Sequence, residues 1–392
     1  MARNTETNSY KALHGANAQQ TLNDVVEQLK TYGAIAENKP NPSYGYEGYD
    51  PAQFDAHQEI TYADGGKAIL YATSSLRSNR IRKDQWRAFN IKEIDDDIEH
   101  AFVVLPDAKG FDQGTEPRDE IREGRVFTAI DDIQTAAEFF DKTMERFEAD
   151  MEAGKRNDLQ GRNLEDLFAS ILNAKENLGR FNGRNEATGF RYEVFELVLT
   201  YLDIKPNTVL SIEASTDIPA LPSGGNPKTD VACLFTMLDG SQKQITFSLK
   251  NTSNRSVSVH EYTAQDFAKV LDPTNTELER LLTAFQRAGS KKDMDPADAK
   301  ALAEELKPYL KKLDYWVFSG CGAEGTEPVQ IADYIVVRNK NNATFSIHTI
   351  KEYCDLLEKG NKGSAGFGTV FSWTYPSKKR GQRIQLKGKI ID

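Results

Sequence analysis

The sequence contains no apolar run of about 18 residues, the length that a membrane-spanning helix needs. Its first residues, Met1-Ala2-Arg3-Asn4-Thr5, also lack the apolar core of a secretory signal. Cysteine is scarce, because Cys233, Cys321 and Cys354 are the only three and lie far apart. An odd, scattered set argues against a disulfide framework or a zinc site. We therefore expect a cytoplasmic protein without membrane contact, in which each cysteine packs as a small apolar side chain.

An excess of positive charge is missing as well. The 392 residues include 59 acidic and 49 basic side chains, which gives a formal net charge of −10 at pH 7. Any site for nucleic acid must therefore be a local basic surface, not the whole molecule. The length allows two or three domains.

The most informative stretch is a predicted β-hairpin. Two runs of apolar and β-branched residues, 231–237 and 245–250, flank the pair Asp239-Gly240, which is a strong turn signal. Asp230 precedes the first run and Lys250 ends the second, so strand pairing brings both side chains to one end of the hairpin. A carboxylate that holds a divalent metal, beside a lysine that stabilises negative charge, is what phosphodiester hydrolysis requires.

This arrangement is the Pro-Asp…(acid)-x-Lys pattern of many metal-dependent nucleases. Pro227 is followed by two residues and then Asp230, while Ser248 occupies the usual acidic position before Lys250. The alternative interpretation of an acid and a lysine at strand ends is a solvated sheet edge without function, and the motif alone leaves both open.

The first 155 residues are predicted to form an α/β domain. Apolar spacing and polar stretches predict a helix at 21–35, a loop at 37–56, a strand at 67–72, a helix at 85–94, a strand at 101–105 and one long helix at 130–155. We place a domain boundary within about ten residues of the end of that helix. The expected domains are residues 1–155 and 160–392.

A basic, hydroxyl-rich segment follows the strand at 67–72. Its side chains, Arg77, Arg80, Arg82 and Lys83, are candidates for contacts with DNA phosphates. Trp86 has helical spacing and is expected in the core rather than on a base-stacking surface.

Residues 67–82 also resemble 245–258, since both are a strand followed by a Ser-, Asn- and Arg-rich segment. This similarity suggests a degenerate nuclease-like fold at the N-terminus. The earlier strand ends in Tyr71-Ala72-Thr73, without a counterpart of Lys250, so we expect no catalysis there.

The same reading gives the elements of the C-terminal part. Helices are expected at 164–172, 194–201, 278–285, 296–312 and 349–358, and strands at 315–319, 331–337 and 343–347.

Three stretches in this part resemble the MspI-type restriction endonucleases. They are Gly224-Gly225-Asn226-Pro227-Lys228-Thr229-Asp230; Ser248-Leu249-Lys250 with Ser256-Val257-Ser258-Val259-His260-Glu261-Tyr262; and Gly366-Phe367-Gly368-Thr369 with Trp373-Thr374-Tyr375 and Gln385-Leu386-Lys387-Gly388. The resemblance covers about residues 160–390. It implies an α/β fold with a mixed β-sheet flanked by helices, to which an N-terminal α/β domain is added. It also implies a monomer or weak dimer that cleaves duplex DNA at CCGG with Mg²⁺, alongside a cognate DNA methyltransferase.

The resemblance assigns roles to individual residues. Asp230 matches the metal-binding aspartate, Lys250 matches the catalytic lysine, and Ser248 stands where that family has asparagine. A hydroxyl is a weaker metal ligand than a carboxylate. Hard oxygen atoms suit Mg²⁺, and we expect them from Asp230, the Leu249 carbonyl and Glu196, with Glu193 as a less favoured acid.

DNA contacts are expected in two places. Residues 373–391 contain basic side chains and no acid, which fits contacts with phosphates and groove edges, although a solvated tail would look the same. By resemblance, Ser258, Thr374, Tyr375 and Lys387 match positions that approach bases. Side chains expected on phosphates are Asn251, Thr252, Arg255, Lys378, Lys379 and Arg383.

His260 lies several residues beyond the predicted metal site, so a structural or DNA-contacting role is favoured over that of a general base. Two other functions remain open from the sequence. One is a DNA-binding protein that has lost cleavage, with Ser248 as a sign of decay. The other is a nuclease that requires modified bases, with the N-terminal domain as the reader.

Overall fold

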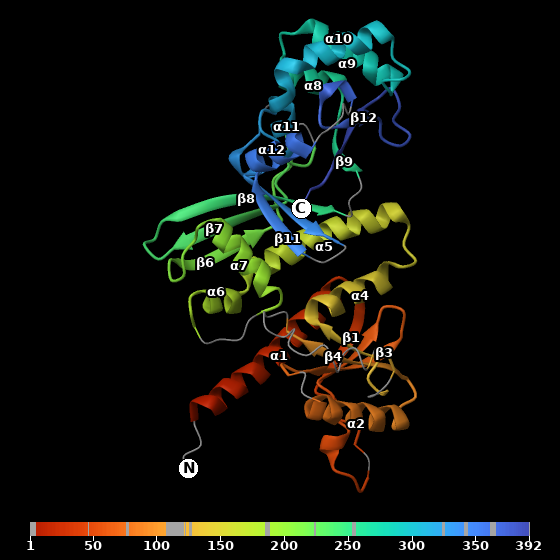
Figure 1. Ribbon diagram of the computed structural model, residues 1–392, viewed down its shortest axis with the longest axis vertical. Helices are drawn as coiled ribbons and strands as arrows, with labels where there is room; N and C mark the ends of the chain where they lie inside the picture. Colours follow the sequence, from red (N-terminus) through yellow and green to blue (C-terminus); the bar gives the residue numbers. More distant parts are fainter. Residues whose placement is uncertain are drawn as a thin grey trace. The chain divides into compact units, whose positions relative to one another are not determined.

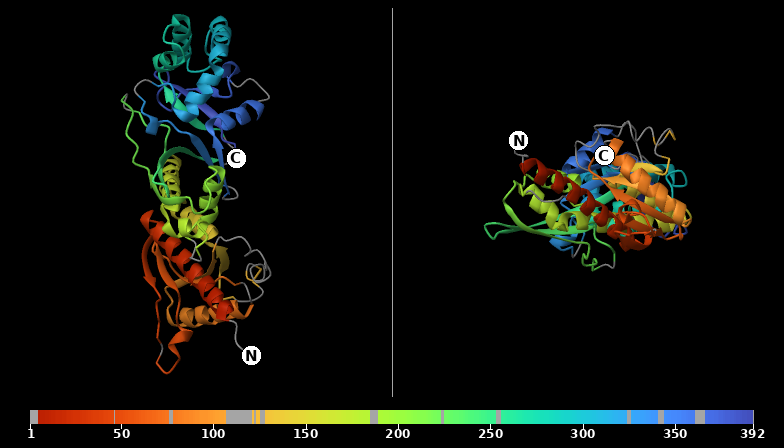
Figure 2. Two further views of the ribbon diagram at one scale, coloured as in Figure 1. Left: turned by 90° about the vertical axis from the view of Figure 1, so that its left-hand side faces the viewer. Right: turned by 90° about the horizontal axis from the view of Figure 1, so that it is seen from below.

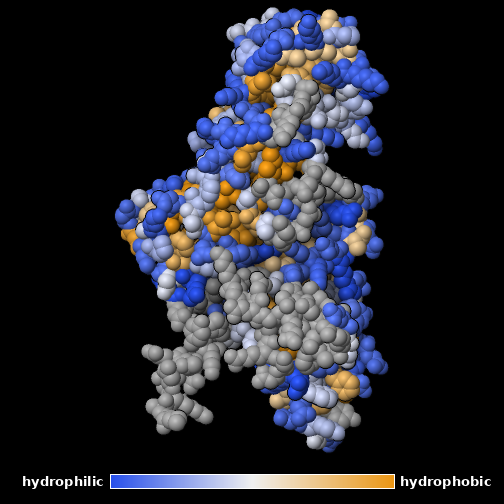
Figure 3. Space-filling view, in the orientation of Figure 1, coloured by the Kyte–Doolittle hydropathy of each residue, from blue (hydrophilic) through white to orange (hydrophobic). Residues whose placement is uncertain are grey.

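The computed structural model describes the chain in two units (Figures 1 and 2). Unit 1 comprises Met1–Ser211 with Met237–Gly240, and unit 2 comprises Ile212–Thr236 with Ser241–Asp392. The described residues are 5–45, 47–75, 78–106, 121, 123–124, 128–184, 189–222, 225–252, 256–323, 326–340, 344–360 and 366–391. On the face in Figure 3, hydrophilic side chains cover most of the described surface, as the high content of charged residues would suggest.

Unit 1 is built on a five-stranded sheet in the order β1-β2-β3-β4-β5. Neighbouring strands are antiparallel from β1 to β3, whereas β4 is parallel to β3 and β5 is parallel to β4. The strands are β1 (Ile35–Pro40), β2 (Gln58–Tyr62), β3 (Lys67–Ala72), β4 (Ile98–Leu105) and β5 (Asp132–Thr135).

Helices cover both faces of this sheet. On one face lie α1 (Thr5–Thr31) and α4 (Ala136–Glu148), and on the other lies α2 (Ser78–Ile94) (Figure 1). Leu22, Val25 and Leu29 of α1 are fully buried, as their helical spacing predicts. The opposite face buries Ile69 of β3 against Ile81 of α2. Alternate β3 residues thus point to opposite faces, which explains why this strand is almost wholly apolar.

Three sequence predictions for unit 1 are wrong. The segment 37–56 is not all loop, because β1 and the short 3-10 helix η1 (Pro51–Gln53) lie in it. The segment 130–155 is not one helix, because β5 precedes α4 and α5 (Ala153–Asn173) begins before residue 155. Thr135 and Glu138 form a reciprocal cap that begins α4, and this polar signal outweighs the apolar spacing around it. The third error is Trp86, which lies on α2 and is 60% exposed instead of buried in the core.

The chain continues through α5, α6 (Lys175–Phe181) and α7 (Tyr192–Tyr201) into the strand β6 (Val209–Ser215). The polar stretch at 155–162 lies inside α5, and the division into units falls within β6. Neither coincides with the boundary expected near residue 155, so the division into domains 1–155 and 160–392 stays a prediction.

The main sheet of unit 2 has the order β11-β10-β8-β7-β6. The predicted hairpin is present: β7 (Val231–Met237) and β8 (Gln242–Thr252) are antiparallel. Gly240 has a φ of 83° in the connecting turn, a conformation that glycine adopts without steric cost. On the other side of β8, β10 (Tyr334–Asn339) runs parallel to it, and β11 (Thr344–Thr349) completes the sheet antiparallel to β10.

A second, three-stranded sheet of unit 2 has the order β12-β13-β9 and is antiparallel throughout. It consists of β9 (Ser256–Tyr262), β12 (Ser372–Thr374) and β13 (Ile384–Lys389). Its first strand follows β8 closely in the chain, whereas the other two come from the C-terminal end. This sheet therefore joins the two stretches that the sequence assigns to DNA contacts.

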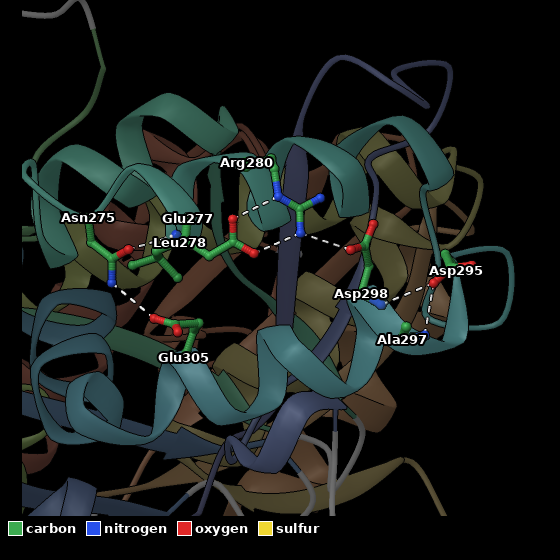
Figure 4. Close-up of polar contacts among 8 residues, drawn as sticks. All are labelled: Asn275, Glu277, Leu278, Arg280, Asp295, Ala297, Asp298 and Glu305. Atoms are coloured by element: carbon green, nitrogen blue, oxygen red, sulfur yellow. Dashed lines mark hydrogen bonds and ion pairs between the residues drawn. The ribbon is translucent and has the colours of Figure 1, made fainter.

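Helices fill the chain between these strands. They are α8 (Ala264–Leu271), α9 (Thr276–Ala288), α10 (Pro296–Leu306), α11 (Leu310–Ser319) and α12 (Ile350–Gly360), with the 3-10 turns η2 (Lys307–Tyr309), η3 (Pro328–Gln330) and η4 (Gly366–Gly368). Arg280 of α9 donates to Glu277 and to Asp298 of α10, which fastens the two helices (Figure 4). Asn275 and Asp295 cap the two helices at their N-termini.

The strand expected at 315–319 is a helix instead. Trp316, Val317 and Phe318 are all buried, and Gly320 ends α11 with a φ of 78°. A short, continuous apolar run that is buried on all sides fits a helix as well as a strand. The spacing of its apolar residues therefore cannot distinguish the two. Cys321, directly after this helix, is exposed, whereas Cys233 and Cys354 are buried as expected. No helix among the described residues is long and apolar enough to span a membrane.

Candidate active site

The site is built on the first residues of β7 and the last part of β8. Val231 pairs with Phe247, and the Asp230 N–H donates to the Phe247 carbonyl oxygen at 2.8 Å. Since side chains alternate along a strand, this register places Ser248 and Lys250 on the same side of β8. The hairpin therefore fixes Asp230 beside both of them, as the sequence predicts.

Lys250 lies among three oxygen atoms. Its Nζ is 3.2 Å from Asp230 Oδ2, 2.8 Å from Ser248 Oγ and 2.8 Å from its neighbour's carbonyl, that of Leu249. The Asp230 and Lys250 side chains are 20% and 24% exposed, whereas Ser248 is buried. The pair thus keeps access to solvent, while the serine lies beneath it.

Asp230 is held by more than its lysine. Its Oδ2 accepts a hydrogen bond from the Leu249 N–H at 2.6 Å and one from the Ser248 hydroxyl at 3.1 Å. A carboxylate fixed by three donors has little freedom to rotate, so one oxygen stays engaged with the sheet. The carboxylate is therefore already oriented before any ligand arrives.

The donor atoms suit a hard divalent cation. The Asp230 carboxylate and the Leu249 carbonyl both turn an oxygen towards the same ammonium group, so they already converge on one positive charge. Mg²⁺ takes such oxygens and retains several water ligands. Among the described residues, no cluster of three or more His, Cys, Asp or Glu side chains could hold a metal. Asp230 Oδ2 and the Leu249 carbonyl oxygen are the two candidate metal ligands that the described residues bring together here.

Glu196 lies on α7, which belongs to unit 1, whereas Asp230 belongs to unit 2. Its role as a further metal ligand stays a prediction. Glu193, on the first turn of the same helix, is 3.4 Å from Arg191 in an ion pair. Arg191 also lies 3.6 Å from Asp141, so the two acids share one guanidinium, and the place of Glu193 as the less favoured acid stays a prediction.

Lys228 is a second lysine near the site that the sequence reasoning passed over. Its Nζ donates to the Val259 carbonyl at 2.8 Å, which ties the segment before β7 to β9. Desolvation, followed by repulsion from Lys250, lowers the pKa of Lys228 to about 7, although Asp230 opposes this shift. The position of Lys228, two residues before Asp230, was the sequence feature that could have indicated a second lysine near the site.

The predicted base-reading residues share the three-stranded sheet. Ser258 on β9 pairs with Lys387 on β13, and Lys387 pairs with Ser372 on β12. All three are exposed, so they form one row across the sheet. Thr374 pairs with Gln385 and is partly buried.

The neighbouring basic side chains divide into two groups. Lys378 is exposed and makes no ion pair among the residues that the structure describes. Lys379 and Arg383 lie 3.1 and 3.8 Å from Glu261, which offsets their charge. Tyr375 is half-buried, with the Arg380 guanidinium 5.5 Å from its ring centre.

Of the three phosphate contacts predicted just after Lys250, two fall on described backbone and one does not. Asn251 and Thr252 end β8, opposite Arg338 and Asn339 of β10, although the Thr252 side chain is outside the described part. Arg255 also lies outside the described residues.

His260 belongs to the core. It is buried, and the centre of its ring lies 4.1 Å from the centre of the Trp316 ring.

The basic segment of unit 1 is helical rather than a loop. Arg80, Arg82 and Lys83 lie in α2, where Arg82 and Lys83 are exposed. Arg80 is 3.8 Å from the buried Asp84. Arg77 lies outside the described residues.

A mixed sheet in which a hairpin brings an aspartate and a lysine together at one end is typical of site-specific endonucleases of the restriction type. The comparisons with known proteins agree. The chain belongs to the family "Restriction endonuclease MspI", whose sequence profile matches residues 139–388. Enzymes of this class generally use a divalent metal ion.

Two relatives extend the match to different lengths. The type II restriction enzyme BsuFI of Bacillus subtilis is 30% identical over 401 aligned positions, which cover 97% of this chain and 98% of that protein. The type II restriction enzyme MspI of Moraxella sp is 26% identical and covers 60% of this chain and 91% of its own length. Similarity to BsuFI therefore includes the N-terminal residues, which the sequence motifs had left outside the resemblance.

A solved structure shows the same fold. The crystal structure of restriction endonuclease MspI in complex with its cognate DNA matches with a TM-score of 0.52 and 23% identity. The match covers 64% of this chain and 99% of the MspI chain. The predicted α/β fold, with a mixed sheet flanked by helices and an N-terminal α/β part, is thus confirmed.

Proposed function

We propose that this endonuclease hydrolyses duplex DNA at CCGG, or at a site that contains it, with Mg²⁺ as its cofactor. The observation that carries the proposal is the position of Lys250, whose ammonium contacts Asp230 Oδ2 and two further oxygens. The contact places a carboxylate that can bind a metal beside an ammonium group that can face a phosphate.

The chain's own residues have separate roles in this proposal. Asp230 and the Leu249 carbonyl would hold the metal, with Glu196 as an added acid. Lys250 stabilises the negative charge that develops on the phosphate and orients the attacking water. Ser248 fixes the lysine from below through its hydroxyl, 2.8 Å away. When bound, Mg²⁺ would make a water more acidic and offset charge on the phosphate.

The recognition side uses the row formed by Ser258, Ser372 and Lys387. A lysine can donate to O6 and N7 of guanine in the major groove, which fits a G·C-rich site. Hydroxyl groups beside it can reach either base of a pair. Lys378 and the end of β8 would contact phosphates, which set the register of the duplex without reading its sequence.

The setting of the enzyme follows from the same proposal. A nuclease that cuts at a short site must spare the DNA of its own cell, so we expect a cognate DNA methyltransferase encoded nearby. We also expect a cytoplasmic location and a monomer or weak dimer. Residues 160–392 would carry catalysis and recognition, and residues 1–155 would form the added domain.

Plasmid cleavage tests the proposal. A plasmid with CCGG sites is incubated with and without Mg²⁺, in unmethylated and CCGG-methylated forms. We expect cutting at CCGG of the unmethylated plasmid only, and only with metal. Cutting of the methylated form alone would indicate a nuclease that requires modified bases. Cutting at sites unrelated to CCGG would overturn the specificity and leave the chemistry intact.

A further inference from the structure

Unit 1 repeats the strand order of the nuclease sheet. In unit 1, β1, β2 and β3 lie side by side, and β4 runs parallel to β3 after the helix α2. In unit 2, β6, β7 and β8 lie side by side, and β10 runs parallel to β8 after the helix α11. The order β1-β2-β3-β4 thus corresponds to β6-β7-β8-β10. Two differences are the insertion of β9 and α8–α10 after β8, and the direction of the last strand.

The correspondence extends to individual hydrogen bonds. The His57 N–H donates to the Leu70 carbonyl at 3.0 Å, just as Asp230 donates to Phe247 at 2.8 Å. Each of these residues directly precedes its strand, β2 or β7. His57 therefore occupies the position of the metal-binding aspartate.

The side chain of His57 also makes the contact that the aspartate makes. The Ala72 N–H donates to His57 Nδ1 at 2.7 Å, and the Leu249 N–H donates to Asp230 Oδ2 at 2.6 Å. Ala72 is two residues beyond Leu70, as Leu249 is two beyond Phe247. The two sites therefore correspond in strand register as well as in strand order.

The same register gives the other replacements. Tyr71 stands in the position of Ser248, and Thr73 in that of Lys250. Thr73 uses its hydroxyl to accept from the Ser75 N–H at 3.2 Å, so it closes a turn instead of facing a ligand. At these equivalent positions, unit 1 thus has neither the acid nor the lysine of the nuclease site.

The groups around His57 are unsuited to binding a metal ion. Burial, together with the charges of Arg80, Arg87 and Lys83, lowers the pKa of His57 to about 4, so the ring is neutral at pH 7. Its Nδ1 is engaged by a backbone N–H, and a lone neutral histidine is a poor ligand for Mg²⁺.

Positive charge dominates the helix beside this site. Arg80, Arg82, Lys83 and Arg87 lie on consecutive turns of α2, and Arg82 and Lys83 are exposed. The nearby buried acid is Asp84, 3.8 Å from Arg80 and 3.6 Å from Arg87. One carboxylate offsets one of four cations, so the surface attracts an anion.

We infer that unit 1 is a second, non-catalytic nuclease core that binds the phosphate backbone of duplex DNA through Arg82 and Lys83 of α2, without a metal ion. The nuclease sheet presents its site to a phosphodiester with the help of a cation. In unit 1, the positive charges come from Arg82 and Lys83 of α2. The positions equivalent to Asp230 and Lys250 hold His57 and Thr73. Backbone binding of this kind is independent of sequence and sensitive to salt.

The test is a salt series of DNA binding by the full-length chain in EDTA. The probe is a duplex without CCGG, so neither cleavage nor base reading contributes. For Arg82→Ala/Lys83→Ala we expect the slope of log K against log salt to fall by about 1–2, since each phosphate contact contributes about 0.9. Binding at low salt should weaken about tenfold or more.

A matched control removes two cations elsewhere in unit 1. Lys30 lies in the last turn of α1, and Lys92 lies at the far end of α2, where it pairs with Asp131. Lys30→Ala/Lys92→Ala should keep the wild-type slope. An unchanged slope in Arg82→Ala/Lys83→Ala, or an equal fall in the control, would overturn the inference. Because no cleavage is measured, the result does not depend on the proposed nuclease activity.

The absence of a metal is tested separately with Mn²⁺, followed by electron paramagnetic resonance. Full-length Asp230→Ala is compared with Asp230→Ala/His57→Asn. We expect the two proteins to bind Mn²⁺ equally weakly. A Mn²⁺ site that survives in the first protein and vanishes in the second would show that His57 holds a metal, and would overturn the metal-free binding.

Discussion

The Lys250 ammonium lies 3.2 Å from Asp230 Oδ2, and both side chains are about four-fifths buried. This contact and the hydrogen bonds around it hold both side chains in place. Loss of one side chain is not equivalent to loss of the other. Without the lysine, the carboxylate keeps the Leu249 N–H and the Ser248 hydroxyl as donors. Without the carboxylate, the Leu249 N–H loses its acceptor, whereas Lys250 keeps Ser248 Oγ and the Leu249 carbonyl.

Removal of either charge should stop cleavage and leave DNA binding almost intact. We expect Asp230→Asn and Lys250→Ala each to abolish cutting with Mg²⁺, while Kd for the CCGG duplex changes less than about tenfold, or 1.4 kcal/mol. Asn at position 230 keeps an acceptor for the Leu249 N–H, so the strand remains held. Plasmid cleavage and a binding isotherm in Ca²⁺ give the two readings.

Lys243, exposed on the same strand β8, is the control for loss of charge. Lys243→Ala should cut at the wild-type rate. Near-normal cutting by Lys250→Ala would show that the reaction does not use this lysine.

Ser248 should act through Lys250 rather than on the phosphate. Its buried hydroxyl bridges Lys250 Nζ and Asp230 Oδ2. Ser248→Ala should lower the single-turnover rate about tenfold, which equals about 1.4 kcal/mol, with Kd for DNA unchanged. A rate loss as complete as that of Lys250→Ala would instead place the serine in direct contact with the reacting groups.

Lys387 and Lys378 should separate base reading from backbone contact. Lys387→Ala should cost about 1–3 kcal/mol on a CCGG duplex and far less on a random one. Lys378→Ala should weaken both duplexes alike and reduce the salt slope by about 1. Competition binding on the two duplexes measures both effects, and equal losses for Lys387→Ala would reduce its role to phosphate contact.

Asp314 on α11 should make stability depend on pH. Burial, followed by the charge of Glu358, raises the pKa of Asp314 from its ordinary value to about 7. The folded chain therefore retains this proton up to about pH 7, whereas the unfolded chain loses it near pH 4. The free energy of unfolding must then fall as the pH rises through that window, by up to about 1.4 kcal/mol per unit.

Asp314→Asn removes this dependence. Relative to wild type, it should gain roughly 1–3 kcal/mol between pH 5 and pH 8, measured by urea unfolding at both values. Glu358→Gln should shift the wild-type curve in the same direction by less. A gap between wild type and Asp314→Asn that stays constant with pH would refute the assignment.

The hairpin and its two charged residues could be predicted from the sequence, because both signals are local. Asp239-Gly240 sets the turn, and the turn sets which residues face each other across β7 and β8. The helices α7, α9 and α12 follow from apolar spacing in the same way. These elements need no information from distant parts of the chain.

Other features depend on contacts that spacing does not report. The run around Trp316 is apolar in any conformation, so only the surrounding core makes it a helix. The row of Ser258, Ser372 and Lys387 joins segments more than one hundred residues apart. Its members were in part predicted through the family resemblance, since spacing alone cannot bring them together.

His57 shows this limit most clearly. The similarity between residues 67–82 and 245–258 was visible in the sequence, but it covers only one strand of each hairpin. The other strand of the hairpin in unit 1, β2, is preceded by a histidine, whereas β7 is preceded by an aspartate. The types of these two residues therefore give no hint that their positions match. Only the hydrogen bonds from Ala72 and to Leu70 reveal the shared position.

The direct passage of the chain from β8 to β9 has a mechanical consequence. Lys250 and Ser258 lie on successive strands with only a short connection between them, and Lys228 ties the segment before Asp230 to Val259 of β9. If the three-stranded sheet reads bases as proposed, a tilt of this sheet on a wrong sequence would displace Asp230 and Lys250 together. The enzyme would then distinguish sites by whether Asp230 and Lys250 are aligned with the phosphate to be cut. A wrong site could be bound without being cleaved.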